Sequence, residues 1–229
     1  MDMQSDQTVP EVQSDTPQSK GERTRIRLLD LAQESIIEKG FNATSIEELV
    51  DAAGITKSGF FYHFRDKQDL ARQLVEYWIE DDTATWDALE KRARELSDDP
   101  LQSFLIFIKL FAETMDDLPD VHPGCLVAAI TYQARSFDPE VKRLSAEGSL
   151  LWRKRFASWL DEIAAHYPPR VPIDMQALAD HLGVIADGGI VWSRIYEDKL
   201  FIGRQARLFH DLVKILFQPN LPGGPQNSV

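Results

Sequence analysis

The 229-residue sequence lacks several features that would each indicate a particular class of protein. It contains one cysteine, Cys125, so no disulfide can form within the chain. It has no run of about 18 apolar residues, which a transmembrane helix would need. Its N-terminus has neither the basic nor the apolar segment of a secretory signal. These absences predict a reduced, cytoplasmic chain that does not span a membrane.

The sequence patterns of catalytic and metal-binding proteins are also missing. We find no nucleophile elbow, no glycine-rich phosphate loop and no pair of carboxylates at catalytic spacing. The five histidines form no i, i+4 pair, and none has an acidic or cysteine companion at ligand spacing. The sequence therefore predicts no catalytic residue, no metal site and no cofactor.

Basic residues are outnumbered by acidic ones, and the formal net charge is −12. Residues 1–18 carry four acidic residues and no basic one, and residues 71–229 carry 24 acidic and 17 basic residues. Residues 19–70 are nearly neutral, with nine acidic and eight basic residues. Because the field of the whole protein repels nucleic acid, a nucleic-acid-binding surface can only be a local patch.

Helical periodicity is present along most of the chain, and strand-like alternation is not. The pattern predicts an all-α fold whose first helix ends at Gly40, in a left-handed conformation with Phe41 folded back. Ser45, Thr56 and Asp66 are predicted to cap the next three helices, and Gly54 to end the second. The expected helices cover about residues 22–39, 45–53, 56–64, 66–96, 101–118, 124–135, 139–167, 175–197 and 200–217.

These helices predict an N-terminal three-helix head on a bundle-like body. The head is expected at residues 22–82 and the body at residues 83–217. The two ends, residues 1–21 and 218–229, are polar and poor in apolar groups. They bury too little surface to offset the entropy of ordering, and we expect them to be disordered.

The segment GITKSGFFYHFRDK, residues 54–67, is unusually aromatic for its length. On a helical wheel Phe60 and Phe64 share one side with Phe61 at its edge, which predicts that the phenylalanines anchor a short helix to its neighbours. The opposite face carries hydroxyl, imidazole and amine groups that can donate to phosphates or base edges. A glycine on that face allows close approach to a groove. With the helix before it, this segment reads as a helix-turn-helix.

The sequence from about Arg23 to Asp82 resembles the DNA-binding head of tetracycline-repressor (TetR) type transcriptional regulators, most specifically in AAGITKSGFFYHFRDK. One departure is Phe61, where the family often has a tyrosine whose hydroxyl reaches a phosphate; Tyr62 is expected to substitute for it. The resemblance implies the following DNA-binding residues, with Thr44 and Ser45 also explicable as helix caps: Thr44, Ser45, Thr56, Lys57, Ser58, Gly59, Phe61, Tyr62, His63 and Lys67.

The resemblance further implies that the C-terminal bundle binds ligand and forms a homodimer through the last two long helices. Gly183, Gly188 and Gly189 would allow those helices to approach closely. Such a dimer would bind a palindromic double-stranded DNA operator as a repressor and release it when a small-molecule inducer binds. The alternative is a protein-binding adaptor that keeps the fold without operator binding, and an all-helical enzyme is a weaker third hypothesis.

Candidate ligand-binding residues in the body are mainly aromatic, since small-molecule pockets are mostly apolar. Cys125 lies where a helix begins, and a helix dipole there favours a reactive thiol. The alternative reading is a small buried hydrophobic side chain. Core packing explains the aromatic residues equally well. The candidate residues are Phe107, Phe111, Cys125, Trp152, Phe156, Trp159 and Trp192.

Overall fold

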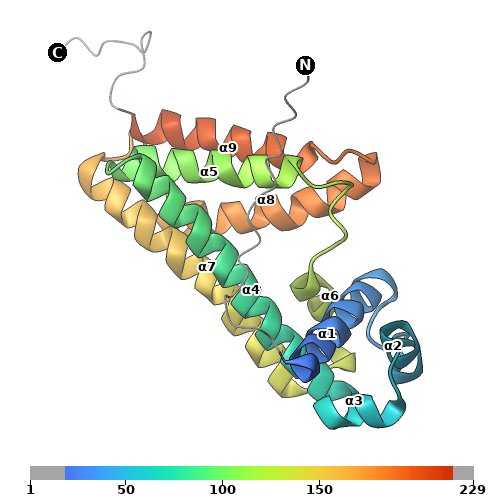
Figure 1. Ribbon diagram of the computed structural model, residues 1–229. Helices are drawn as coiled ribbons and strands as arrows, with labels where there is room; N and C mark the ends of the chain where they lie inside the picture. Colours follow the sequence, from blue (N-terminus) through green and yellow to red (C-terminus); the bar gives the residue numbers. More distant parts are fainter. Residues whose placement is uncertain (1–18, 219–229) are drawn as a thin grey trace, which may run out of the picture.

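The computed structural model describes residues 19–218, which are all-α with no strand (Figure 1). Most of the sequence predicted to be disordered lies outside these residues, but Ser19 and Lys20 cap and begin the first helix. The helices are α1 (Lys20–Lys39), α2 (Ile46–Ala53), α3 (Lys57–His63), α4 (Lys67–Leu96), α5 (Pro100–Asp116), α6 (Leu126–Tyr132), α7 (Pro139–His166), α8 (Met175–Tyr196) and α9 (Phe201–Phe217), with a 3-10 turn η1 (Ala134–Ser136).

The predicted helix starts are confirmed by the capping hydrogen bonds. Ser45 forms a full capping box with Glu48, while Thr56 and Asp66 accept from backbone N–H groups at the starts of α3 and α4. Most ends agree with the prediction to within two residues. The exception is the end of α6, which stops at Tyr132 before η1.

Gly40 has a positive φ of 90°, as predicted, but its ψ of 160° is not left-handed helical. This backbone region is almost restricted to glycine. Phe41 is buried, and its ring packs 4.4 Å from the Phe137 ring between centroids. Phe41 therefore joins the core of the head and also contacts a segment far along the chain.

The long helices α4 and α7 contact each other and connect the two ends of the molecule (Figure 1). Helices α1–α3 and α6 gather at one end, and α5, α8 and α9 at the other. No helix within residues 19–218 has both the length and the apolar character to cross a membrane.

The core of the head includes side chains from well beyond the predicted head. Buried residues of α1–α3 and of the first half of α4 form one hydrophobic cluster. The same cluster contains Leu126 and Ile130 of α6, Phe137, and Val141 of α7. Residues 126–141 are therefore part of the packing that holds the helix-turn-helix in place.

Polar contacts attach the same segment to the head. Gln133 Oε1 accepts from the backbone N–H of Phe41 at 3.0 Å, and Asn42 donates to Ser136 Oγ at 2.8 Å. Gln68 of α4 donates to the Ser136 carbonyl at 2.9 Å. We call residues 133–138 the docking segment.

A second, aromatic cluster forms the core of the body, from Trp86 on α4 to Phe217 on α9. It includes residues of α4, α5, α7, α8 and α9. The two clusters meet along α4 and α7, so that α4 takes part in both. A displacement of α4 in the body would therefore reach the head directly.

Candidate nucleic-acid interface

Helices α2 and α3 and the turn between them form the predicted helix-turn-helix. Gly54 ends α2 in the left-handed conformation, with φ 68° and ψ 36°. Its N–H bonds to carbonyls of the last turn of α2. Thr56 Oγ1 then accepts from the Gly59 N–H at 3.1 Å and starts α3. Glycine suits the left-handed position because it has no Cβ to collide with the backbone.

The two faces of α3 divide as predicted. Phe60 and Phe64 are fully buried in the head cluster. Tyr62 is 83% exposed and Phe61 48% exposed, with the Phe61 ring edge-to-face against Phe60. A seven-residue helix is too short to be stable alone, so these buried rings hold it in position. Tyr62 presents the phenol hydroxyl that Phe61 lacks.

The polar face of α3 carries donors close to the surface. Ser58 is exposed, and Gly59 and His63 are half-buried. Burial, followed by the nearby Arg25, lowers the pKa of His63 below its ordinary 6.5. At neutral pH its imidazole is therefore uncharged and can both donate and accept a hydrogen bond.

The two lysines predicted to bind DNA are already engaged within the head. Lys57 Nζ lies 2.5 Å from Glu47 Oε1 in an exposed ion pair. Lys67 Nζ lies 4.3 Å from the centre of the Phe41 ring, and burial lowers its pKa. Exposed pairs contribute only about 0–1 kcal/mol, so Lys57 can exchange Glu47 for a phosphate at small cost. Lys67 is less available.

Thr44 and Ser45 are less suited to phosphate contact than the sequence suggested. Thr44 is 1% exposed, and its hydroxyl bonds to the Gly40 carbonyl and to Ser35. The Ser45 hydroxyl accepts from the Glu48 N–H and donates to the Glu48 carboxylate. Both hydroxyls therefore serve the head's internal structure. Thr44 does not lie on the exposed surface of the helix-turn-helix.

A buried carboxylate behind α3 was missed by the sequence analysis. Asp69 accepts from the Arg65 N–H at 3.0 Å and from Arg72 at 2.8 Å. Burial raises the pKa of Asp69, but these hydrogen bonds outweigh it and hold the pKa below 3.8. Gln73 donates to both Asp69 and the His63 carbonyl, which joins α4 to the end of α3. The acid lies three residues after the N-cap of α4, and this capping-box spacing is the signal that could have revealed it.

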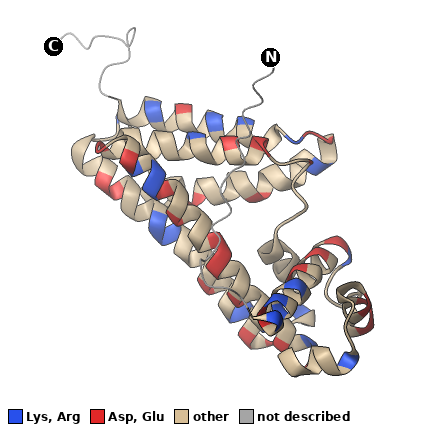
Figure 2. Cartoon of the chain, in the orientation of Figure 1, with Lys and Arg blue, Asp and Glu red and all other residues tan. Residues whose placement is uncertain are grey.

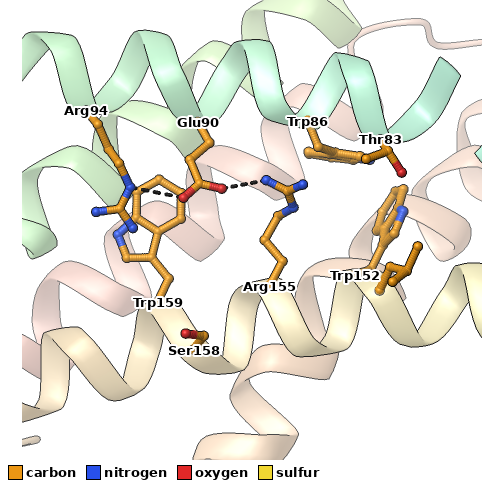
Figure 3. A pocket seen from close by; sticks show the side chains of 9 residues that line it. Thr83, Trp86, Glu90, Arg94, Trp152, Arg155, Ser158 and Trp159 are labelled. Carbon is orange, nitrogen blue, oxygen red and sulfur yellow. Dashed lines mark hydrogen bonds and ion pairs between the residues drawn. The ribbon is translucent and has the colours of Figure 1, made fainter. Parts of the chain in front are cut away.

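The body contains a separate pocket, on the seam between α4 and α7 (Figure 3). Its volume is about 330 Å³, and Trp86, Trp152 and Trp159 line it. Arg94 from α4 and Arg155 from α7 both donate to Glu90, at 3.0 and 2.5 Å (Figure 3). The pocket thus combines aromatic rings with a row of paired charges.

Five of the seven candidate ligand-binding residues gather around this region. Trp152 and Trp159 line the pocket, while Phe107, Phe111 and Phe156 lie behind it in contact with one another or with Trp86. The three phenylalanines are buried in the core cluster. They support the pocket and do not line it.

Trp192 and Cys125 lie elsewhere. Trp192 is about half exposed on α8, where its ring stacks on Tyr196. Cys125 precedes α6, and burial together with the Asp187 carboxylate raises its pKa to about 12. A thiol with this pKa stays protonated at neutral pH, so its surroundings favour the inert reading over the reactive one. Among residues 19–218, no group of three or more His, Cys, Asp or Glu side chains is arranged to hold a metal ion.

Comparisons with known proteins agree with this architecture. The sequence profile of the family described as "Bacterial regulatory proteins, tetR family" matches residues 28–74. The transcriptional regulator AcuR of Cereibacter sphaeroides is 26% identical over 169 residues, which are 73% of this chain and 75% of that protein. The repressor KstR2 of Rhodococcus jostii is 32% identical over 72 residues, which are 31% of this chain and 34% of that protein. A TetR-family regulator from Agrobacterium tumefaciens has the same fold, with a TM-score of 0.71 at 20% identity, covering 86% of this chain and all of the other.

The helix-turn-helix, its exposed polar face and these relatives define the class: the protein is a DNA-binding transcriptional regulator. Its residues 28–74 match the TetR family, and the relatives reported above are named as transcriptional regulators. The resemblance first drawn from residues 23–82 is thereby confirmed.

Proposed function

We propose that the protein acts in the cytoplasm as a homodimeric repressor that binds a palindromic operator and releases it when a small molecule binds the body. Residues 22–82 would form the DNA-binding domain and residues 83–217 the ligand-binding and dimerisation domain. The assignment as a repressor is supported by relatives such as KstR2, which is named a transcriptional repressor. The observation that carries the proposal is an exposed apolar face on α8 and α9.

This face is formed by two stripes at helical spacing, all of whose residues are exposed. Val184, Val191 and Ile195 follow one side of α8, and Leu208 and Leu212 one side of α9. A groove of about 410 Å³ lies between the helices. Exposed apolar patches of this kind mark interaction sites. A second copy of the chain would bury the same face on both subunits, as two-fold symmetry requires.

The glycines of α8 support a close approach at this face. A Cβ on Gly183 or Gly188 would meet nothing within 4 Å, whereas one on Gly189 would lie 3.1 Å from Ile202. Gly189 therefore serves the packing of α8 on α9 within one chain. Gly183 and Gly188 leave space that a second copy can fill.

Two heads related by such an axis would read adjacent major grooves, about 34–36 Å apart. A small molecule in the α4–α7 pocket would act by moving α4, because α4 belongs to both hydrophobic clusters. The ligand can change operator affinity only through its different affinity for the two dimer shapes. Binding would be detected through quenching of the tryptophans that line the pocket.

Sedimentation and DNA binding test the dimer together. We expect the wild type to sediment as a dimer at micromolar concentration, and Val191→Glu combined with Leu208→Glu to sediment as a folded monomer with much weaker operator binding. Leu150→Glu is the control, because Leu150 is exposed on α7, outside this face. A monomeric wild type would contradict the proposal.

Selection of duplexes from a random pool tests operator recognition. The enriched sequences should contain two symmetric half-sites about one helical turn apart. In a transcription reaction with such a site at the promoter, added protein should lower the RNA yield. Asymmetric or unenriched sequences would contradict operator binding by a dimer, and a raised RNA yield would contradict repression.

A further inference from the structure

The outward face of α1 carries segregated charge. Lys20, Arg23 and Arg27 follow one another at spacings of three and four in its N-terminal half, and Glu34 and Glu38 continue the same face in its C-terminal half. All five are exposed. Residues at these spacings lie on one side of a helix. Figure 2 shows blue at one end of α1 and red toward the other.

The basic half of α1 lies beside the helix-turn-helix. The Arg27 guanidinium donates to the Ala52 carbonyl at 2.9 Å, at the end of α2. At the start of α1, the Cβ position of Gly21 lies 3.9 Å from His63 Cε1, at the end of α3. The basic half therefore extends from the turn before α3 to the last residue of α3. The C-terminal half of α1 lies beside the start of α2 instead, where Lys39 pairs with Glu48.

The two lysines of the helix-turn-helix that are predicted to bind DNA are engaged within the head, so phosphate binding needs positive charge from another element. Lys57 is paired with Glu47, and Lys67 is half-buried over Phe41. The side chain of Arg27 makes its bond to an uncharged carbonyl, which leaves its full charge available. Lys20 is exposed at the end of the same stripe.

We propose that the N-terminal half of α1, through Lys20 and Arg27, binds phosphates of the DNA backbone beside the major groove that α3 enters. This proposal rests on the DNA-binding function. Lysine and arginine contacts to phosphates fix position and orientation and carry no sequence information. The acidic half of α1 would be repelled by the backbone, so the helix can approach DNA with its basic end only. The charged face of α1 thereby sets the orientation of the head relative to the DNA.

The salt dependence of binding tests this contact. Each phosphate contact adds about 0.9 to the slope of log affinity against log salt concentration. We expect Lys20→Ala and Arg27→Ala each to lower this slope by about one contact. The loss should be equal on a selected duplex and on a mixed-sequence duplex, so that the ratio of the two affinities stays unchanged. Arg27→Lys should keep the wild-type slope, since it keeps the charge.

Lys39→Ala is the matched control. Lys39 lies on α1 beyond the acidic half, paired with Glu48 at 2.6 Å, and its loss changes the total charge by the same amount. The control should keep the wild-type slope. Unchanged slopes in Lys20→Ala and Arg27→Ala, or an equal loss in Lys39→Ala, would overturn the proposal. A wild type that binds neither duplex would instead overturn the function on which it rests.

Discussion

Most aromatic side chains of α3 and its C-cap either anchor the helix or face outward. Phe60 and Phe64 are buried and fix the helix against the head, whereas Tyr62 extends into solvent. Phe61 lies between these extremes. The division follows from the 3.6-residue period, which is why it was predictable from residue positions alone.

Gly59 offers a way to separate folding from DNA recognition. A Cβ at this position would lie 3.6 Å from Ile55 and Thr56, an ordinary contact distance. Gly59→Ala should therefore stabilise the head by about 0.5–1 kcal/mol through its better helix propensity. The added methyl group should nevertheless weaken operator binding about tenfold, or about 1.4 kcal/mol, by holding the backbone away from the groove.

Urea denaturation and DNA titration of the same Gly59→Ala protein measure the two effects. Ser58→Ala is the comparison, since it removes a predicted DNA contact from the same face without adding bulk and so separates a lost hydrogen bond from steric exclusion. Unchanged operator affinity in Gly59→Ala would show that the backbone does not approach the groove at this residue.

The sequence identified the outward residues of α3, but it did not show that Thr44 and Asp69 are buried. Thr44 resembles a cap in sequence, yet the turn after Gly40 buries its hydroxyl against the Gly40 carbonyl. Asp69 was not singled out from the sequence, although its partners Arg65 and Gln73 lie only four residues away, because its burial arises only when α4 packs in the head. The burial of these two residues depends on tertiary packing, which periodicity does not contain.

Among the helices, α4 and α7 are joined by a half-buried carboxylate, that of Asp82. Both Trp86 of α4 and Trp152 of α7 donate their indole N–H to Asp82 Oδ2. Burial raises the pKa of Asp82 from 3.8 to about 6. The folded protein therefore holds this proton more tightly than the unfolded chain does. The resulting stabilisation is complete below about pH 4 and is lost as the pH rises through about 6.

Asp82→Asn should remove this pH dependence, because the amide stays neutral. The free energy of unfolding of the variant minus that of the wild type should therefore increase by about 1 kcal/mol between pH 5 and pH 7. Urea unfolding at one fixed protein concentration measures the difference, since dissociation of a dimer would otherwise contribute. Wild-type and variant stabilities that change in parallel between these pH values would contradict the prediction.

The helices themselves were largely predictable, because capping residues and glycines stand at their ends. Ser45, Gly54, Thr56 and Asp66 each act as expected. The end of α8 shows what such signals miss: Glu197 takes the left-handed conformation, with φ 52°, although no glycine is present. Local capping hydrogen bonds accompany this conformation, with the Glu197 N–H bonded to carbonyls of the last turn of α8, against the residue's own preference.

For the molecule as a whole, the boundary between head and body in sequence does not coincide with the boundary between hydrophobic clusters. Periodicity placed the helices correctly, but it could not show that α6 packs into the head. That contact joins residues about 100 positions apart, such as Ile36 and Ile130 within one cluster. The net negative charge of residues 71–229 creates a field that disfavours non-specific DNA binding. Only close contacts can therefore hold the head on DNA.

Ile130 tests this arrangement. It is 3% exposed and lies in the head cluster, although it falls within the predicted body. Ile130→Ala should destabilise the protein by about 2–5 kcal/mol and raise hydrogen exchange in α1–α3. Val127→Ala on the same short helix is the control, since Val127 is only partly buried. Enhanced exchange confined to the body would contradict the shared core.

The docking segment has a consequence for protein engineering. Gln133 lies so close to Gly40 that a Cβ there would come within 2.6 Å of its side-chain oxygen. In a chimera that joins residues 19–82 to the body of a relative, the turn at Gly40 would contact the relative's residues in place of Gln133. The hydrogen bond from Phe41 to Gln133 would be lost. A graft that also carries residues 126–141 would keep the side chains that complete the head cluster and the hydrogen bond between Gln133 and Phe41. The part of this regulator that can be transferred as a unit thus consists of two separate stretches of sequence, residues 19–82 and 126–141.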